Sequence, residues 1–130
     1  MSGRVVHFEI PFDDAERAMS FYRGLFGWDL QTLPGEFGGY VMVSTGPTGE
    51  QGPAEPGYIN GGLSPRDQST GAVNVVIDVE DIDAKLKEIE AQGGQVMAGR
   101  AAVGEMGFAA YFKDPEGNVV GLWENAPGPG

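Results

Sequence analysis

The chain contains no cysteine among its 130 residues and only one histidine. The lack of cysteine excludes disulfide bonds, thiolate metal sites and a cysteine nucleophile, and it suits a protein of a reducing compartment. The N-terminal residues contain no long apolar run, so we expect neither a signal peptide nor a membrane span. These absences together predict a cytoplasmic protein.

Basic residues are also scarce. Eight Lys and Arg stand against nineteen Asp and Glu, which gives a formal net charge of −11. Because such a charge repels phosphate backbones and anionic lipids, we expect no nucleic-acid partner and no membrane partner. Phosphate-loop, dinucleotide-binding and nucleophile-elbow motifs are missing, so phosphoryl transfer, nucleotide redox chemistry and serine hydrolysis have no support. The length predicts a single domain over residues 1–130.

What the chain does contain is an internal repeat. The strand-like run at residues 5–10 recurs at residues 73–78, and Asp14 recurs as Asp81 at the same offset of 67. Each aspartate can cap a helix, and each precedes apolar residues at three- and four-residue steps that end at a glycine. The matched positions favour a true repeat over coincidence.

Short strands are expected after each predicted helix. They fall at residues 29–32, 40–44 and 57–61 in the first half and at residues 95–98, 108–112 and 117–121 in the second. The last pair is aligned through Gly57 and Gly117, at an offset of 60. The order β-α-β-β-β therefore occurs twice, in a first module of about residues 4–66 and a second of about residues 70–125.

This order predicts an α+β fold in which two tandem βαβββ modules form a curved mixed sheet around a central cup. The Gly/Pro-rich stretch 46–57 and the tail 126–130 are expected to be mobile. A cup between repeats is a natural place for a small ligand. Side-chain alternation along the strands gives the expected ligand-binding residues: His7, Glu9, Ile59, Gly61, Asn74, Val76, Gly121 and Trp123.

Three motifs carry a resemblance to a known family. They are an H-x6-D opening from His7 to Asp14, the helix end FYRGLFGW at residues 21–28, and the segment DPEGN at residues 114–118. In this order and spacing, over residues 4 to 124, they resemble the vicinal-oxygen-chelate superfamily of glyoxalases, extradiol dioxygenases, fosfomycin-modifying enzymes and bleomycin-binding proteins. The resemblance implies the fold and leaves the chemistry open.

The resemblance also implies a metal ligand on the first and on the last strand of each module. His7 takes one first-strand position and is a competent imidazole ligand, whereas its counterpart Asn74 is a weak ligand for a transition metal. Both last-strand positions fall on glycine, at Gly61 and Gly121. One good ligand of four therefore remains.

Two carboxylates are weak candidates to replace the missing ligands. Glu9 lies two residues from His7 on the same strand face, whereas Glu124 needs a bulge to turn toward the side of Gly121. An ion held by such a set would be Zn²⁺, Ni²⁺, Mn²⁺ or Fe²⁺. The sequence does not assign a cofactor.

The leading hypothesis is a member of this family with a degenerate metal site that binds a small, largely apolar molecule. The alternative is a metal-dependent glyoxalase-like lyase, isomerase or dioxygenase that uses His7 with Glu9 or Glu124. A third possibility is an interaction module with an empty cup. Family relatives often dimerise, so the resemblance also implies a homodimer.

Overall fold

The computed structural model describes residues 3–67 and 71–127. The chain forms two compact units: residues 7–73, called here the N-terminal unit, and residues 1–6 with 74–130, called the C-terminal unit. No helix in the described part of the chain is long and apolar enough to cross a membrane. Residues 128–130 of the tail that was expected to be mobile lie outside the described residues.

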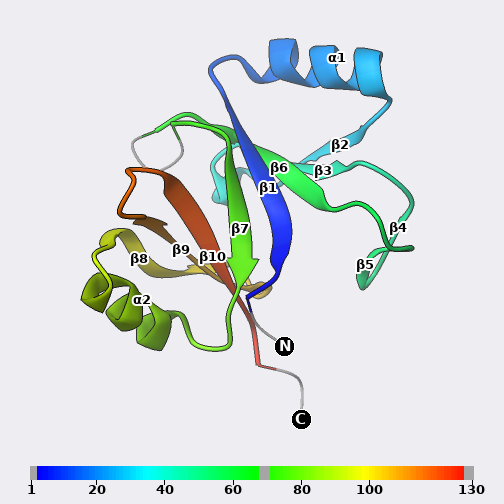
Figure 1. Cartoon of the computed structure of the whole chain (residues 1–130). Helices are drawn as coiled ribbons and strands as arrows, with labels where there is room; N and C mark the ends of the chain where they lie inside the picture. Colours follow the sequence, from blue (N-terminus) through cyan, green and yellow to red (C-terminus); the bar gives the residue numbers. More distant parts are fainter. Residues whose placement is uncertain (1–2, 68–70, 128–130) are drawn as a thin grey trace. The chain divides into compact units, whose positions relative to one another are not determined.

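The N-terminal unit contains a mixed β-sheet and one long helix (Figure 1). Its strand order is β2-β3-β6-β1, in which β1 and β6 are parallel and the other neighbours are antiparallel. Strands β4 and β5 form a separate two-stranded sheet. The elements are β1 (Val5–Phe12), α1 (Ala15–Phe26), β2 (Asp29–Thr32), the 3-10 helix η1 (Gly35–Phe37), β3 (Val41–Ser44), β4 (Thr48–Gly49), β5 (Gly52–Pro53) and β6 (Asn60–Pro65).

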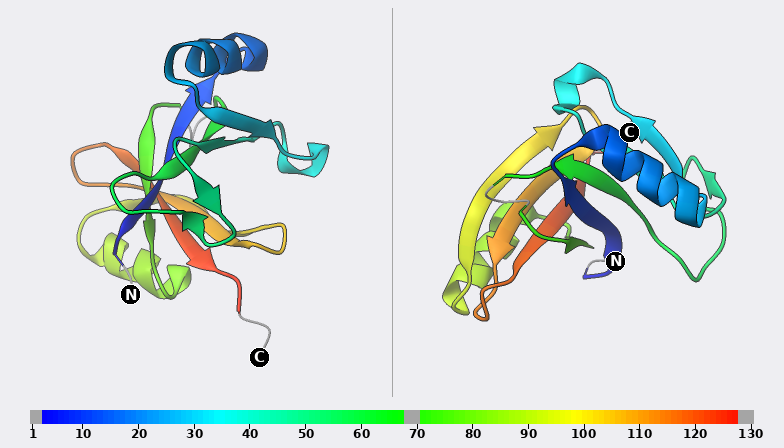
Figure 2. Two further views of the ribbon diagram at one scale, coloured as in Figure 1. Left: turned by 90° about the vertical axis from the view of Figure 1, so that its right-hand side faces the viewer. Right: turned by 90° about the horizontal axis from the view of Figure 1, so that it is seen from above.

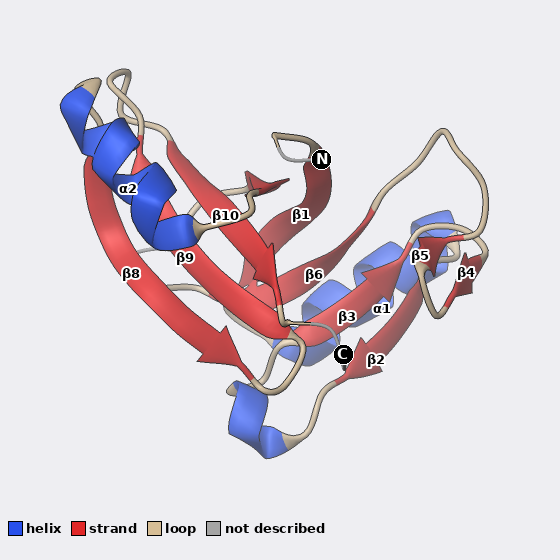
Figure 3. Cartoon of the chain, turned by 90° about the horizontal axis from the view of Figure 1, so that it is seen from below, coloured by secondary structure: helices blue, strands red, loops and turns tan. Residues whose placement is uncertain are grey.

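The C-terminal unit repeats this plan. Its strand order is β7-β10-β9-β8, with β7 and β10 parallel and the other neighbours antiparallel, and its strands lie side by side in Figure 2. Helix α2 lies along one face of β8, β9 and β10 (Figure 3). The elements are β7 (Asn74–Asp78), α2 (Ile82–Ala91), β8 (Gln95–Val103), β9 (Gly107–Lys113) and β10 (Val119–Asn125). The predicted α+β fold of two tandem βαβββ modules is therefore confirmed.

Both long helices begin at the aspartates that the repeat singles out. Asp14 Oδ1 accepts a hydrogen bond from Arg17 N, and Asp81 Oδ1 accepts one from Ala84 N, each at 3.0 Å. Such a cap satisfies a backbone N–H that has no partner inside the helix, and it stabilises a helix by about 1 kcal/mol. Helix α1 ends at Gly27, whose φ of 69° is a left-handed conformation that glycine adopts without strain.

Each unit has its own apolar core. Strand residues Val41 and Leu63 are fully buried in the N-terminal core, and Ile82 and Leu122 occupy the C-terminal one. The two helices contribute unequally, because α2 buries Ile82 and Leu86 whereas α1 has no buried residue. Helix α1 contacts its core through three partly buried side chains: Ala18, Met19 and Tyr22.

Three large apolar side chains of α1 are exposed. Phe21, Leu25 and Phe26 are 54%, 62% and 61% exposed. Tyr22 stacks on Trp28 with ring centroids 4.9 Å apart. Aromatic side chains at the end of this helix therefore pack on one another, and Tyr22 also packs against the core.

The Gly/Pro-rich stretch 46–57 has regular structure that its composition does not predict. It contains the β4-β5 pair, and Ala54 N donates a hydrogen bond to the Pro47 carbonyl at 2.8 Å. The Tyr58 hydroxyl donates to the same carbonyl at 2.6 Å, and Asn60 Nδ2 donates to Thr48 Oγ1 at 2.9 Å. Hydrogen bonds thus fix the conformation of residues 46–57, which glycine and proline content alone does not predict.

The DPEGN segment forms the turn that leads into β10. Asp114 Oδ1 accepts hydrogen bonds from Glu116 N and Asn118 N, both at 2.9 Å, and Gly117 has a φ of 88°. These hydrogen bonds, chiefly the backbone bond from Asn118, hold the pKa of the Asp114 carboxyl below its usual value. The motif therefore serves a structural purpose at this position.

Candidate functional site

Strand β1 separates two kinds of side chain. Phe8, Ile10 and Phe12 pack against the core of the N-terminal unit, on the side where α1 contributes its residues. Because side chains alternate along a strand, His7 and Glu9 lie on the other face. Glu9 is only 6% exposed. A buried polar site therefore lies on the face of the sheet opposite the core, where alternation places both residues.

A third residue, Tyr40, joins these two side chains. Its hydroxyl lies 2.7 Å from His7 Nε2 and donates to Glu9 Oε2 at 3.2 Å. Since a phenol has one proton and here gives it to the carboxylate, the contact with His7 requires Nε2–H to donate to the phenol oxygen. The three residues therefore form a chain of hydrogen bonds from imidazole to phenol to carboxylate.

Burial determines the charge of the His7 ring in this hydrogen-bonded group. It lowers the pKa of His7 from 6.5 to about 4, because the charged imidazolium loses its hydration inside the protein. At neutral pH the His7 ring is therefore uncharged. A neutral imidazole, a phenol and a carboxylate can bind the polar end of a ligand and can exchange protons with it.

The glycine next to this site is Gly62, and the prediction that Gly61 lies on this face is wrong. In the parallel register Glu9 stands beside Gly62, whereas Gly61 stands beside Phe8. A Cβ added at Gly61 would meet the Phe8 carbonyl oxygen at 2.5 Å and the Phe8 ring at 2.6 Å. Gly61 therefore faces the core side of the sheet.

Tyr40 fills the space that Gly62 leaves. A Cβ added at Gly62 would overlap the hydroxyl and ring of Tyr40. In the C-terminal unit Gly121 stands beside Val76, the counterpart of Glu9 at the repeat offset of 67. Gly62 and Gly121 are thus the equivalent pair, at an offset of 59, and both modules do carry glycine at this strand position.

Ser64 lies on the same face as Gly62, two residues further along β6 and in register with Pro11. Its Oγ is buried and has no hydrogen-bond partner within residues 3–67 and 71–127. An unpaired buried hydroxyl costs about 1–3 kcal/mol. This atom is therefore available to a bound water or to a polar group of a ligand.

The C-terminal unit carries a second set of the predicted residues. Gly121 would place a Cβ 3.0 Å from Val76 and 3.2 Å from the Tyr111 ring, on the face opposite the buried Leu122 and the helix. Asn74, at the start of β7, is 6% exposed, and neither its Oδ1 nor its Nδ2 has a partner in the described part of the chain. Trp123 Nε1 donates to Asn125 Oδ1 at 2.8 Å. A ligand-binding role for these residues stays a prediction.

Two other predicted residues have structural contacts. Ile59 precedes β6, and its carbonyl accepts a hydrogen bond from Thr45 Oγ1 at 2.7 Å. Glu124 accepts from Ile82 N at 2.9 Å and from Arg100 Nη2 at 2.9 Å, so it ties β10 to the start of α2. The hydrogen bond from Arg100 lowers the pKa of the Glu124 carboxyl. Glu124 faces the helix side, as alternation predicted.

The donor set does not fit a divalent cation. Nε2 of His7 is already bonded to Tyr40, and the Tyr40 ring occupies the side-chain position of Gly62. Within the described ranges, no three His, Asp or Glu side chains come together as a group that could hold a metal ion. No step of a reaction is therefore assigned to a metal.

Comparison with known proteins agrees with the fold and the motifs. The profile of the Glyoxalase/Bleomycin resistance protein/Dioxygenase superfamily matches residues 4–122, and the chain belongs to this superfamily. It is 34% identical over 122 residues to the Mycobacterium bovis protein named "Putative glyoxylase CFP32", covering 89% of this chain and 43% of that protein. It is 28% identical to lactoylglutathione lyase GLX1 of Arabidopsis thaliana, covering 97% of this chain and 46% of that protein. The chain thus spans less than half the length of both relatives.

Solved structures show the same fold. A methylmalonyl-CoA epimerase of Streptomyces coelicolor, in complex with 2-nitronate-propionyl-CoA, matches with a TM-score of 0.68 and covers 98% of this chain and 100% of its own. A superfamily member from Vibrio splendidus matches with a TM-score of 0.60 over 95% of this chain and 98% of its own. Their identities of 21% and 16% establish likeness of fold alone.

The sequence offered two of the three residues of the hydrogen-bonded chain. His7 and Glu9 follow from strand alternation, whereas Tyr40 lies 33 residues from His7 and is joined to it only by the folding of the sheet. The single signal for it was a tyrosine at the start of a predicted strand. That signal does not distinguish a site residue from a core residue.

Proposed function

We propose that the protein binds a small, largely apolar organic molecule through the face of the N-terminal unit that carries His7, Glu9 and Tyr40, without a catalytic metal. The observation that carries this proposal is the Tyr40 hydroxyl, which bonds to both His7 and Glu9 over the space left by Gly62. The Tyr40 side chain beside Gly62 thus makes a hydrogen-bonding site at the position where the superfamily resemblance implies a metal ligand.

The chemistry of the site favours a ligand with a polar, uncharged end. Glu9 accepts hydrogen bonds and repels anions, the neutral His7 ring adds no positive charge, and Ser64 Oγ can donate or accept. A hydroxyl or amide group on the ligand would match these partners. Asn74, Val76, Gly121 and Trp123 remain proposed contacts for the apolar part, since the sequence pattern selects them.

A second candidate is an enzyme of the lyase or isomerase class, and the names of two relatives favour the lyase. In this version Glu9 and the neutral His7 would move protons on the ligand, with Tyr40 between them. Dioxygenase chemistry, and the use of Glu124 as a ligand, have weaker support because Glu124 is hydrogen-bonded to Arg100 and Ile82.

Calorimetric titration with Zn²⁺, Ni²⁺, Mn²⁺ and Fe²⁺ tests the metal-free part of the proposal. We expect heats equal to dilution for the wild type, and a tight one-to-one site would overturn the proposal. Conversion of lactoylglutathione, measured with and without each ion, tests the second candidate.

The binding part is tested with a fragment library screened by ligand-observed NMR. His7 is the chain's only histidine, so its ring protons report directly on the site. We expect hits to shift these resonances in the wild type and to bind about tenfold more weakly to Tyr40→Phe, which loses only a hydroxyl. Hits that leave the His7 resonances unchanged would argue against this face as the site.

A homodimer and a cytoplasmic location belong to the same proposal. The absence of cysteine supports the location, and the more than half-exposed Leu25 and Phe26 support the dimer. Sedimentation equilibrium of the purified chain tests the dimer. The interaction module with an empty cup is the outcome left if neither ligand nor metal binds.

A further inference from the structure

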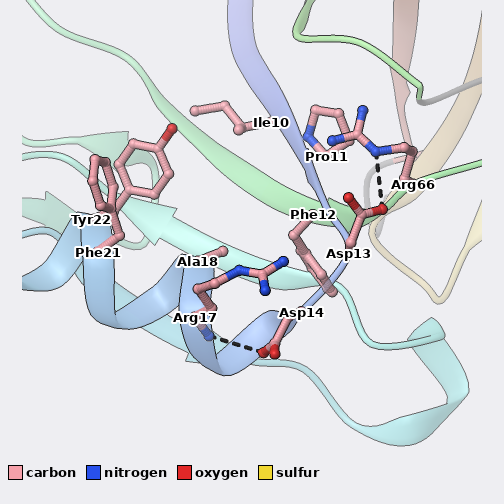
Figure 4. Close-up of a pocket in the computed structure, with 10 residues that line it drawn as sticks. All are labelled: Ile10, Pro11, Phe12, Asp13, Asp14, Arg17, Ala18, Phe21, Tyr22 and Arg66. Atoms are coloured by element: carbon pink, nitrogen blue, oxygen red, sulfur yellow. Dashed lines mark hydrogen bonds and ion pairs between the residues drawn. The ribbon is translucent and has the colours of Figure 1, made fainter.

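The N-terminal unit has a pocket on the opposite face of β1 from His7 and Glu9. It has a volume of about 340 Å³, within the range of small-molecule sites, and it lies between β1 and the first turns of α1 (Figure 4). Nothing in the superfamily resemblance or in the proposed function assigns a role to this pocket.

Apolar side chains form much of this pocket. Ile10 and Phe12 come from β1, and Ala18, Phe21 and Tyr22 come from α1. Phe21 meets Tyr22 edge-on with ring centroids 5.2 Å apart, yet 54% of Phe21 remains exposed. An aromatic surface that is exposed beside a pocket is a favourable contact for the apolar body of a ligand.

Every charged side chain of the pocket except one has a hydrogen-bond partner. Arg66 Nε bonds to Asp13 Oδ1 at 3.1 Å, and Asp14 Oδ1 accepts from Arg17 N at the start of α1. The Arg17 guanidinium has no hydrogen-bond or ion-pair partner among the residues that the structure describes. Figure 4 shows this guanidinium extending past Ala18 toward Phe12, inside the pocket.

We propose that this pocket binds an amphipathic organic anion, an aromatic or short acyl group that carries one carboxylate or sulfonate. The guanidinium of Arg17 would take the anionic group through two parallel N–H donors, and Phe12, Phe21 and Tyr22 would contact the apolar body. The net charge of −11 repels anions from the surface as a whole, so selective binding requires a local cation of this kind.

The test uses 1-anilinonaphthalene-8-sulfonate, whose fluorescence rises when it leaves water, with the full chain. The two key variants are Arg17→Gln and Arg23→Gln, which remove the same charge from the same helix, inside the pocket and outside it. We expect about tenfold weaker binding to Arg17→Gln and unchanged binding to Arg23→Gln. Arg17→Lys, which keeps the charge but loses the paired donors, should fall between them.

A neutral analogue separates the two parts of the site. N-phenyl-1-naphthylamine has the same rings without the sulfonate, so it should bind equally to wild type and Arg17→Gln and more weakly to Phe21→Ala. Equal affinity of the sulfonate for Arg17→Gln and Arg23→Gln overturns the proposal, provided that both variants unfold at the same urea concentration. A chemical-shift change of the His7 ring protons on addition of the sulfonate would place the sulfonate on the other face of β1. That result would also overturn the proposal.

Discussion

Helices α1 and α2 start from equivalent aspartates, but α2 inserts buried side chains into its core, whereas α1 contacts its core only through partly buried ones. At the repeat offset of 67, Ala15 of α1 corresponds to Ile82 of α2, which is fully buried. An alanine at that position gives α1 no large side chain to insert under its first turn. The pocket at Arg17 and Ala18 opens at this end of α1. The two modules therefore start their helices with the same aspartate cap and still pack those helices to different depths.

A pair of leucine truncations, one on each helix, should show the largest effect of this difference in packing. Leu86→Ala on α2 should destabilise the protein by about 2–4 kcal/mol, because Leu86 is 7% exposed and its removal leaves a cavity. Leu25→Ala on α1 should cost less than about 0.5 kcal/mol, because Leu25 is 62% exposed. Urea unfolding followed by circular dichroism measures both values. Similar losses for the two variants would show that α1 is packed as firmly as α2.

Acid should affect the two modules differently, because the first has His7 where the second has Asn74. The unfolded chain binds a proton on His7 near pH 6.5 and the folded chain near pH 4, so the unfolded state holds more protons between these values. Stability from this residue is therefore present above pH 6.5 and is lost as the pH falls toward 4, by about 3 kcal/mol. His7→Gln should remove this dependence. The ring protons of the single histidine should titrate near pH 4, and a midpoint above 6 would contradict the burial of the ring.

The equivalent glycines give the smallest expected difference. Gly62→Ala should cost about 1–3 kcal/mol, because the new methyl group overlaps Tyr40, whereas Gly121→Ala should cost less than about 1 kcal/mol. Combining Gly62→Ala with Tyr40→Leu should cost less than the sum of the two single changes, since the smaller side chain relieves the overlap. Additive losses in the double variant would indicate that Tyr40 does not occupy the space beside Gly62.

Much of the fold was predictable from the sequence because its signals are local. Strand β2 has its predicted bounds, the capping aspartates start both long helices, and Gly27 ends α1. The bounds of β6 were less predictable, since it starts at Asn60 rather than at Gly57. Composition likewise concealed the β4-β5 pair, whose conformation depends on side-chain hydrogen bonds from Tyr58 and Asn60.

The error at Gly61 has a specific physical cause. Gly57 and Gly117 both have positive φ and are sound anchors for aligning the two turns. The first module, however, has five residue steps from Gly57 to its site glycine, Gly62, where the second has four from Gly117 to Gly121. A slip of one residue in a strand reverses every side chain, so an alignment that is right at the turn puts the wrong glycine at the site.

The outermost strand of the C-terminal unit, β8, has a consequence for the behaviour of the protein at high concentration. Its pairing with β9 shifts register twice, between Val96 and Ala98 and between Ala98 and Ala101. Such irregularities interrupt the even row of free backbone groups that a strand from another molecule needs as a template. The nine-residue edge strand β8 can therefore stay exposed at low risk of fibril growth. A deletion that restored a regular register between β8 and β9 would remove this protection.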